Sequence, residues 1–264
     1  MNWYRAKTIL IVFFVITNIF LLYNIIFTGR GDTYIKDEII LYTTDILKKN
    51  GIEMGTDIPK KKKSIRQFNA NNIVTDYGEF AKRVLGESFS QTGENEYKSD
   101  VGELSFSGDR FLLKLNSYKI GKPSKNNTDT AKNCLKAFKI DISDYVAEET
   151  DDGVCFKQEI DGMQVFNSEL WVKFSGDKLG EISGVWFEKS SDIADSSEMK
   201  PITSVLIDIL SSPECPKENA KITDLTLGYM VYDTESYHKS IMPMPVWKIS
   251  FGKDDFIYMD ARGN

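Results

Sequence analysis

The sequence predicts an α+β protein in which one apolar N-terminal helix precedes a polar domain of helices and antiparallel strands. Three observations support this class. Residues 8–27 are almost entirely apolar, helical and alternating hydrophobic patterns then follow one another, and a short motif recurs between alternating apolar runs. Helices followed by runs of strands favour an antiparallel sheet with helices on one face.

The segment from Thr8 to Phe27 contains twenty mostly apolar residues without a charge. At about 1.5 Å per residue, a helix of this length crosses the roughly 30 Å of a bilayer's hydrocarbon core. A secretory signal needs a shorter apolar region and a cleavage pattern of small residues, which does not follow Phe27. We therefore expect a retained single-pass membrane anchor, with a cleaved signal peptide as the alternative.

The residues that flank this span indicate its orientation. Residue types of the membrane interface precede it: Trp3, Tyr4, Arg5 and Lys7. Arg30 and Lys36 follow it, so the Lys and Arg counts on the two sides are nearly level. The α-amino group adds one positive charge on the N-terminal side, and by this narrow margin the charges favour a cytoplasmic N-terminus and an extracellular C-terminal domain at the cell membrane.

Polar side chains within the span are the candidate contact residues. Thr17 and Asn24 are seven residues apart and fall on nearly one face of a helix, and Asn18 follows Thr17. An amide in lipid costs free energy unless it is hydrogen-bonded, and such amides often lie between helices. We expect Thr17, Asn18 and Asn24 to contact a transmembrane partner. The alternative places Asn24 near the outer interface, where an amide reaches water.

Composition limits the function classes. The chain has 264 residues and a net charge of −6, and the first thirty residues hold three basic and no acidic side chains, so the remainder carries −9. Because a nucleic-acid binder needs a basic face, we expect no nucleic-acid partner. Cys134, Cys155 and Cys215 form neither a disulfide framework nor a CxxC motif, and we expect buried thiols, with one bridge between two of them as the alternative.

Residues 31–72 are expected to form a juxtamembrane helix and a linker. Apolar residues recur at helical spacing from Ile35 to Leu47, between the candidate cap Asp32 and the terminating Gly51. This helix is either a stalk packed on the outer domain or a partner-binding helix. The following stretch contains Pro59 and several asparagines, which is typical of a connector.

The run from Lys60 to Lys63 has two interpretations. Four consecutive lysines repel one another and stay solvated, which favours a mobile connector. The other interpretation is attraction to anionic lipid headgroups or acidic wall polymers. Because such attraction decays within about 8 to 10 Å, it requires the run to lie close to that surface.

A recurring string predicts the organisation of the outer part. Glu103–Arg110 is echoed by Glu169–Lys178 and, more weakly, by Trp247–Asp255, and each string places a Gly-containing turn between alternating apolar runs, as in a β-hairpin. A candidate helix precedes each string, at residues 76–85, 128–140 and 201–210. We expect related α+β modules, the first of which is short and merges with the second. The expected boundaries are 1–30, 31–72, 73–190 and 191–264.

The inventory of catalytic side chains is thin. His238 is a single histidine in a polar segment, and the Ser-Gly-Asp strings lack the context of a nucleophile turn. No glycine-rich phosphate loop or calcium-loop spacing is present, so we expect no cofactor and no metal. The sequence predicts a protein that is not an enzyme. The acidic residues that a hydrolase would need are Asp151, Asp152, Asp254 and Asp255.

The layout resembles the YycI family of Firmicutes, also called WalI. The opening block Met1–Phe14 places a Trp and a Lys before the span, as in that family. Asn50-Gly51-Ile52, Ile58-Pro59 and the C-terminal Pro245–Ile249 and Tyr258–Gly263 agree with it. The C-terminal pattern also resembles PepSY-like modules. The resemblance implies an extracytoplasmic α+β domain related to YycH, and no catalytic residues.

In that family, the protein acts with YycH to adjust WalK, the membrane histidine kinase of a cell-wall two-component system, with a contribution from the transmembrane helices. The leading hypothesis is therefore a non-enzymatic accessory regulator whose partners are a WalK-like kinase, a YycH-like protein and the membrane. Its sign of regulation is not predicted. The alternatives are an anchored hydrolase of wall glycans or peptides and a PepSY-like inhibitor of a peptidase.

Overall fold

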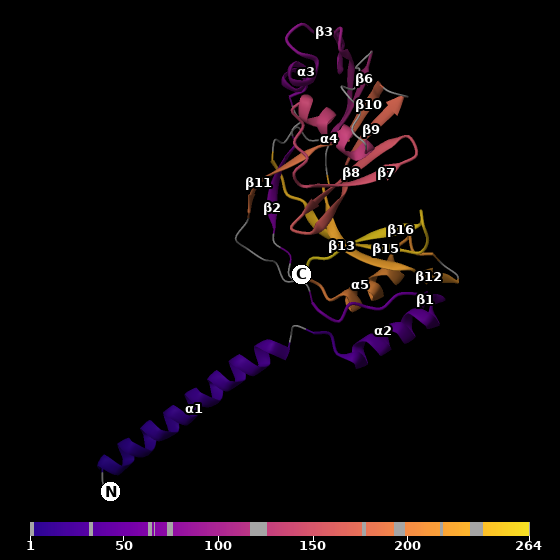
Figure 1. Cartoon of the computed structure of the whole chain (residues 1–264). Coiled ribbons are helices and arrows are strands. Elements are labelled where there is room, and N and C mark those ends of the chain that lie inside the picture. Colours follow the sequence, from indigo (N-terminus) through magenta and orange to yellow (C-terminus); the bar gives the residue numbers. More distant parts are fainter. Residues whose placement is uncertain are drawn as a thin grey trace. The chain divides into compact units, whose positions relative to one another are not determined.

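The computed structural model describes residues 3–31, 34–62, 65, 67–72, 76–116, 126–175, 178–192, 199–216, 219–232 and 240–263, and it has a mixed α+β fold (Figure 1). The chain forms two compact units. One, which we call the terminal unit, comprises residues 1–64, 198–225 and 249–264; the other, the central unit, comprises residues 65–197 and 226–248.

The terminal unit is built mainly from helices and short strands. Its elements are α1 (Trp3–Gly31), α2 (Asp37–Lys49), β1 (Ile52–Met54), α5 (Ile202–Asp208), the 3-10 helix η2 (Ile209–Ser211), β12 (Ala220–Ile222) and β16 (Phe256–Asp260). Helix α2 packs beside α5 and β1, and β1 pairs in parallel with β12, Ile52 opposite Ala220. Their apolar faces form the core of this unit, in which Leu47, Leu206 and Ile222 are fully buried.

The central unit is built on an antiparallel sheet. Its elements are β2 (Phe68–Asn72), α3 (Tyr77–Leu85), β3 (Ser90–Gly93), β4 (Glu96–Lys98), β5 (Gly102–Ser107), β6 (Arg110–Leu115), α4 (Asn127–Ala137), β7 (Tyr145–Thr150), β8 (Gly153–Ile160), β9 (Met163–Ser175), β10 (Lys178–Val185), β11 (Phe187–Asp192) and β14 (Ser240–Ile241). Strands β13 (Asp224–Met230) and β15 (Met244–Ser250) cross the boundary between the units.

Strand β9 organises this sheet. Strands β10, β6, β5, β4 and β3 follow it in that order on one side, and β8 and β7 extend from its other edge. The central row of opposed residues shares one face: Leu104, Leu113, Ile182, Val172 and Val154. All five are at most 1% exposed. A row of this kind joins five strands into a single packing surface.

Helices α3 and α4 contribute to the same core as this row. The cluster includes Phe80 and Val84 from α3 and Ala131 and Leu135 from α4. Elements expected in the first and in the second module therefore belong to one buried cluster. Both helices begin at a side-chain cap: Asp76 accepts from the Glu79 N–H at 2.9 Å, and Asn126 accepts from the Thr128 N–H at 2.7 Å.

The three hairpins predicted from the recurring string are confirmed where they are described. The chain turns at Gly108 between β5 and β6, and Ser175 pairs with Lys178 between β9 and β10, although Gly176 and Asp177 lie outside the described residues. Between β15 and β16, the Phe251 N–H donates to the Asp255 carbonyl at 2.8 Å. A helix precedes each hairpin, as expected.

The region expected to be a linker differs from that expectation. Residues 51–72 contribute two strands, β1 and β2, and β2 pairs with β11 and β14. The partners of both strands lie far along the chain, and local sequence patterns carry no information about such pairing. The compact units also interleave along the chain, because residues after 191 contribute α5 and β12 to one unit and β14 to the other.

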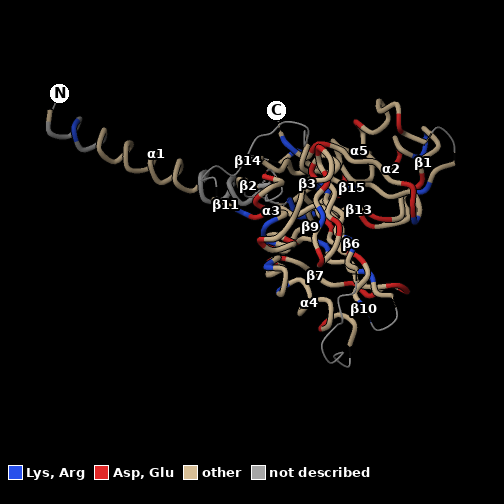
Figure 2. Tube along the Cα trace, turned by 90° about the horizontal axis from the view of Figure 1, so that it is seen from above, with Lys and Arg blue, Asp and Glu red and all other residues tan. Residues whose placement is uncertain are grey.

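Helix α1 is 29 residues long, and in Figure 2 its tan middle part carries no charged residue. Large apolar side chains from Leu10 to Leu22 are about half to three-quarters exposed, with Phe13 at 71%. In the portion of the chain open to description, no helix meets the length and hydropathy that a bilayer crossing needs.

Phe80 is expected to be a strong determinant of stability. Its ring is 2% exposed and lies 4.9 Å from the Phe111 ring and 5.9 Å from the Phe106 ring, measured between centroids. Phe80→Ala should lower the free energy of unfolding of the central unit by about 3 to 5 kcal/mol, because it leaves a cavity. Denaturant titration of the full chain, followed by tryptophan fluorescence, measures this change. Val146→Ala, at a 51% exposed position on β7, is the control and should change it by less than about 0.5 kcal/mol.

Candidate functional site

The candidate contact residues of α1 lie on one side of the helix. At about 100° per residue, Thr17, Asn18 and Asn24 fall within an arc of roughly 120°. Val15 and Ile19 lie on the opposite side. The backbone at Asn24 is helical, but its side chain lies outside the described part of the structure. The structure thus places Thr17 and Asn18 on one exposed helix surface. That the Asn24 side chain shares this surface stays a prediction.

Both described polar side chains bond back to their own helix. The Thr17 hydroxyl donates to the Phe13 carbonyl at 2.9 Å, and the Asn18 amide donates to the Phe14 carbonyl at 2.8 Å. An amide has two N–H donors and an accepting oxygen, so this bond accounts for one donor of Asn18. The remaining hydrogen-bonding capacity of the amide exceeds that of the Thr17 side chain, which makes Asn18 the stronger candidate for a contact between helices.

The N-terminal flank of α1 carries an aromatic and a basic side chain in contact. The Lys7 Nζ lies 5.4 Å from the centroid of the Trp3 ring, one helical turn away. Both residues are exposed. The side chains of Tyr4 and Arg5 lie outside the described residues. A Trp with a nearby Lys suits the water–lipid boundary, where an apolar ring and a charged group are both accommodated.

The lysine run is held against the start of α2, which sequence patterns did not indicate. The Ile35 N–H donates to the Lys60 carbonyl at 2.7 Å, and Tyr34 and Lys61 form an antiparallel bridge. The Lys60 ammonium pairs with Asp37 at 2.8 Å. Asp32 and Lys63 lie outside the described residues. Residues 60–62 therefore lie beside residues 34–37, directly before and at the start of α2, and do not form a free connector.

The carboxylates that a hydrolase would use lie in hairpin turns. Asp151 and Asp152 form the exposed turn between β7 and β8, and the Asp152 carbonyl accepts from the Phe174 N–H at 3.0 Å. Asp254 and Asp255 are exposed in the turn that precedes β16. Each pair thus forms part of a solvent-exposed turn, without an enclosed pocket around it.

The other residues considered for chemistry are either turn residues or outside the described part. Ser107 is exposed at the β5–β6 turn. His238 lies outside the described residues. Among those that are described, no group of three or more His, Cys, Asp or Glu side chains could hold a metal ion.

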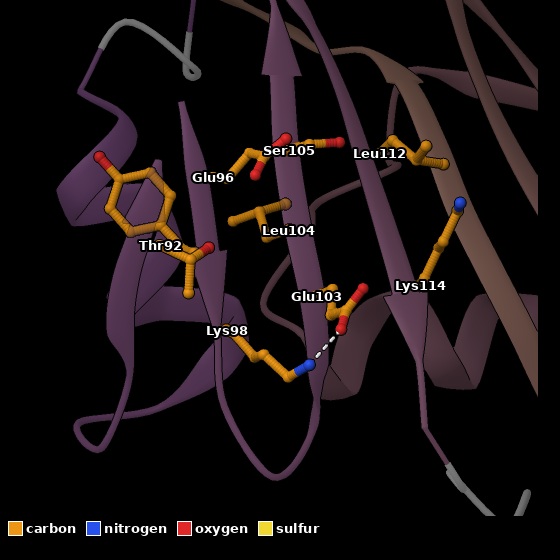
Figure 3. Close-up of a pocket in the computed structure, with 9 residues that line it drawn as sticks. Thr92, Glu96, Lys98, Glu103, Leu104, Ser105, Leu112 and Lys114 are labelled. Atoms are coloured by element: carbon orange, nitrogen blue, oxygen red, sulfur yellow. Dashed lines mark hydrogen bonds and ion pairs between the residues drawn. The ribbon is translucent and has the colours of Figure 1, made fainter. Parts of the chain in front are cut away.

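One cavity of about 320 Å³ lies over β4, β5 and β6, on the face opposite the helices (Figure 3). Ser105 and Leu112, which line it, are register partners and alternate with the buried row. Figure 3 shows Lys98 directed at Glu103, and this ion pair lowers the pKa of the Glu103 carboxyl. With Glu96 and Lys114 the lining holds two acids and two lysines, so it does not select a ligand by net charge.

Two further cavities flank the C-terminal part of α4. One of about 570 Å³ is lined by Lys132, Lys136, Lys139, Asp141 and Tyr145 among others, and one of about 390 Å³ by Arg83, Asp100 and Phe138 among others. The hydroxyl of Tyr145 lies 3.2 Å from that of Ser168, and burial raises the pKa of Tyr145. None of the three cavities is lined by the hydrolase carboxylates.

All three cysteines are free thiols. Cys134 and Cys155 are buried, as expected, whereas Cys215 is partly exposed. Burial raises the pKa of each thiol, and that of Cys155 reaches about 12. A thiol reagent attacks the thiolate, so both ionisation and access limit the reaction of the buried pair.

Thiol labelling of the folded chain at pH 8 should therefore occur in two phases. Cys215 is expected to react first, and Cys134 and Cys155 only as the central unit opens. At this pH a thiol with a pKa near 12 has roughly a thousandth of the thiolate of an ordinary cysteine. Mass spectrometry of labelled peptides identifies the sites, and Cys215→Ser should remove the fast phase. Rapid labelling of Cys155 without denaturant would contradict its burial.

Comparison with known proteins identifies the family. A family model described as "YycI protein" matches residues 37–258. A search of curated proteins gives no match.

Among solved structures, the chain is similar to an uncharacterized protein from Eubacterium rectale ATCC 33656, with 10% identity over 79% of this chain and 86% of that chain and a TM-score of 0.39. It is also similar to YycH from Bacillus subtilis, with 12% identity over 76% of this chain and 52% of that chain and a TM-score of 0.42. Because the family model spans most of the sequence, this chain belongs to the YycI family.

Proposed function

We propose that this protein is a non-enzymatic, membrane-anchored regulator that modulates a WalK-like histidine kinase together with a YycH-like protein. The observation that carries the proposal is the family match over residues 37–258, since YycI proteins are regulatory. The hydrolase alternative gains no comparable support, because its candidate carboxylates are turn residues. The family match names a YycI protein and so does not favour the peptidase-inhibitor alternative.

The anchor is part of the proposal. Helix α1 presents exposed apolar side chains from Leu10 to Leu22, and transfer of such surface from water to lipid is favourable. The Trp3 and Lys7 pair supports an interface at its N-terminal end. We propose that residues 8–27 span the cell membrane once, with the N-terminus in the cytoplasm and the α+β units outside.

Regulation requires that the protein bind two states of the kinase with different affinity. A complete switch, from 1:99 to 99:1, needs about 5.5 kcal/mol of differential binding. A hydrogen bond between helices in a membrane contributes on average about 0.6 kcal/mol. Contacts by Thr17, Asn18 and Asn24 therefore supply roughly 2 kcal/mol, and contacts of the outer units must supply the rest. In this proposal, α1 biases the equilibrium and the outer units complete the change.

Exchanging the two asparagines tests the intramembrane contact. Asn18→Leu with Asn24→Leu should weaken co-purification with the kinase about tenfold, because two polar contacts between helices are lost. Quantitative pull-down from solubilised membranes measures the association, and a kinase-dependent reporter measures signalling. The matched control replaces Val15 and Ile19 by leucine on the opposite side of α1 and should leave both unchanged. Equal association of the double asparagine variant and the natural protein would reject this face as the contact.

The carboxylate variants separate the regulator from the hydrolase. Alanine at Asp151, Asp152, Asp254 or Asp255 should leave kinase signalling unchanged within about 20%, because substitutions at exposed turn positions perturb a fold little. The same variants are tested for release of wall fragments from purified cell walls. If the natural protein releases wall fragments and any one of these variants abolishes that release, the result would contradict the proposal and favour the hydrolase.

A further inference from the structure

The lysine run lies beside the exit of α1. Tyr34 follows Gly31, the last residue of α1, by three residues, and a chain segment of that length reaches about 10 Å at most. The Tyr34–Lys61 bridge and the hydrogen bond from the Ile35 N–H to the Lys60 carbonyl hold the run next to Tyr34, and therefore within this distance of the end of α1. A distance of about 10 Å equals roughly one Debye length at physiological salt, so charges on the run act on whatever surrounds the end of α1.

The charges at this junction are mainly positive. Residues 34–38 and 58–62 contain four lysines (Lys36, Lys60, Lys61 and Lys62) and two acidic residues (Asp37 and Glu38). One further acidic residue, Asp57, directly precedes the second segment. Lys60 pairs with Asp37, but their side chains are 60% and 73% exposed, and pairs this exposed contribute little and exchange readily for another anion. Lys61 is exposed as well. The basic side chains are thus accessible to a ligand.

Tyr34 adds an aromatic side chain to this cluster. It is 60% exposed and is the bridge partner of Lys61. An exposed Tyr next to lysines is typical of the headgroup layer of a membrane, which adds about 5 to 8 Å on each side of the hydrocarbon core. Helix α1 continues about 6 Å past the proposed span, and the next three residues add about 10 Å at most, so Tyr34 lies within about 16 Å of the hydrocarbon core. The junction is therefore within about one Debye length of the headgroup layer, whereas a wall polymer would not need so short a connection.

We propose that Tyr34, Lys36 and Lys60–Lys62 form a juxtamembrane site that binds the phosphates of anionic phospholipid headgroups. The site rests on the proposed membrane anchor. Occupation by lipid neutralises the mutual repulsion of the lysines and thereby stabilises the Tyr34–Lys61 bridge, which ties the lysine run to the residues directly before α2. Lipid charge then controls how firmly the outer units are held at the membrane surface.

Amide hydrogen exchange of the full chain in lipid nanodiscs tests the site. One disc contains phosphatidylcholine alone and the other adds phosphatidylglycerol at about one third, a content that gives the surface a strong negative potential. The reporter is the Ile35 amide, because its bond to Lys60 closes the junction. A ligand that binds only the closed form slows exchange in proportion to its occupancy, and each lysine near an anionic surface contributes about fivefold in binding. Exchange at Ile35 should therefore be at least about fivefold slower in the anionic disc.

Two arms identify the cause. Lys61→Ser with Lys62→Ser should remove the slowing, whereas Lys48→Ser with Lys49→Ser, at the other end of α2 and about 18 Å away, should retain it. Because substitution could itself loosen the bridge, the natural chain is also measured in 1 M sodium chloride, where a Debye length of about 3 Å should abolish the slowing without any change of sequence.

The remaining outcomes separate the site from the anchor. If the chain enters the discs but Ile35 exchanges equally in both, the lipid site is rejected and the anchor stands. If the chain fails to enter the discs, both are rejected. Slowing in phosphatidylcholine discs on addition of soluble polyglycerol phosphate, without any effect of phosphatidylglycerol, would overturn the assignment to lipid. Loss of the slowing in the Lys48 and Lys49 control would also overturn it, because charge anywhere on α2 would then suffice.

Discussion

The central unit depends on one cross-strand row, in which Leu104, Leu113, Ile182, Val172 and Val154 face one another across five strands. Because successive side chains on a strand alternate between faces, a slip of one residue in any pair would move that row out of the core. The alternating residues include Ser105 and Ser183, whose hydroxyls would then be buried under α3 and α4. The apolar row therefore fixes the register of the whole sheet.

The same register explains why the two faces of the sheet differ in exposure. The helix-covered face is closed by Phe80, Leu135 and their neighbours, and the two cavities on this side lie beside the C-terminal part of α4. The opposite face carries half-exposed residues such as Leu112 and Trp171 and the cavity bounded by Glu103 and Lys98. At this cavity acids and lysines are equal in number, so recognition there would depend on shape and hydrogen bonds rather than on net charge.

Local features of the fold were predictable from sequence, and long-range ones were not. Asp76 and Asn126 lie directly before amphipathic segments, and Gly108 lies between alternating runs, so helix starts and a hairpin follow from neighbouring residues. The pairing of Ile52 with Ala220 has no local signal, which is why a connector was expected there.

The candidate site, too, was predictable only in its local features. Helical spacing places Thr17 and Asn18 on one side of α1, but the position of Lys61 depends on its bridge to Tyr34, a contact that no periodicity encodes.

The position of the lysine run bears on membrane orientation. The positive-inside rule counts Lys and Arg close to the span along the chain, as they are during insertion. By that count Lys60–Lys62 do not contribute, and the narrow margin favours a cytoplasmic N-terminus. In the folded chain the same lysines lie beside Tyr34, so a count by spatial distance would add three basic residues to the other side. The two counts differ because the bridge forms only after residues 58–62 have been made and folded. In the proposed orientation, the lysines can therefore approach the outer membrane surface without having opposed insertion. Both are possible because the run is separated from α1 along the chain.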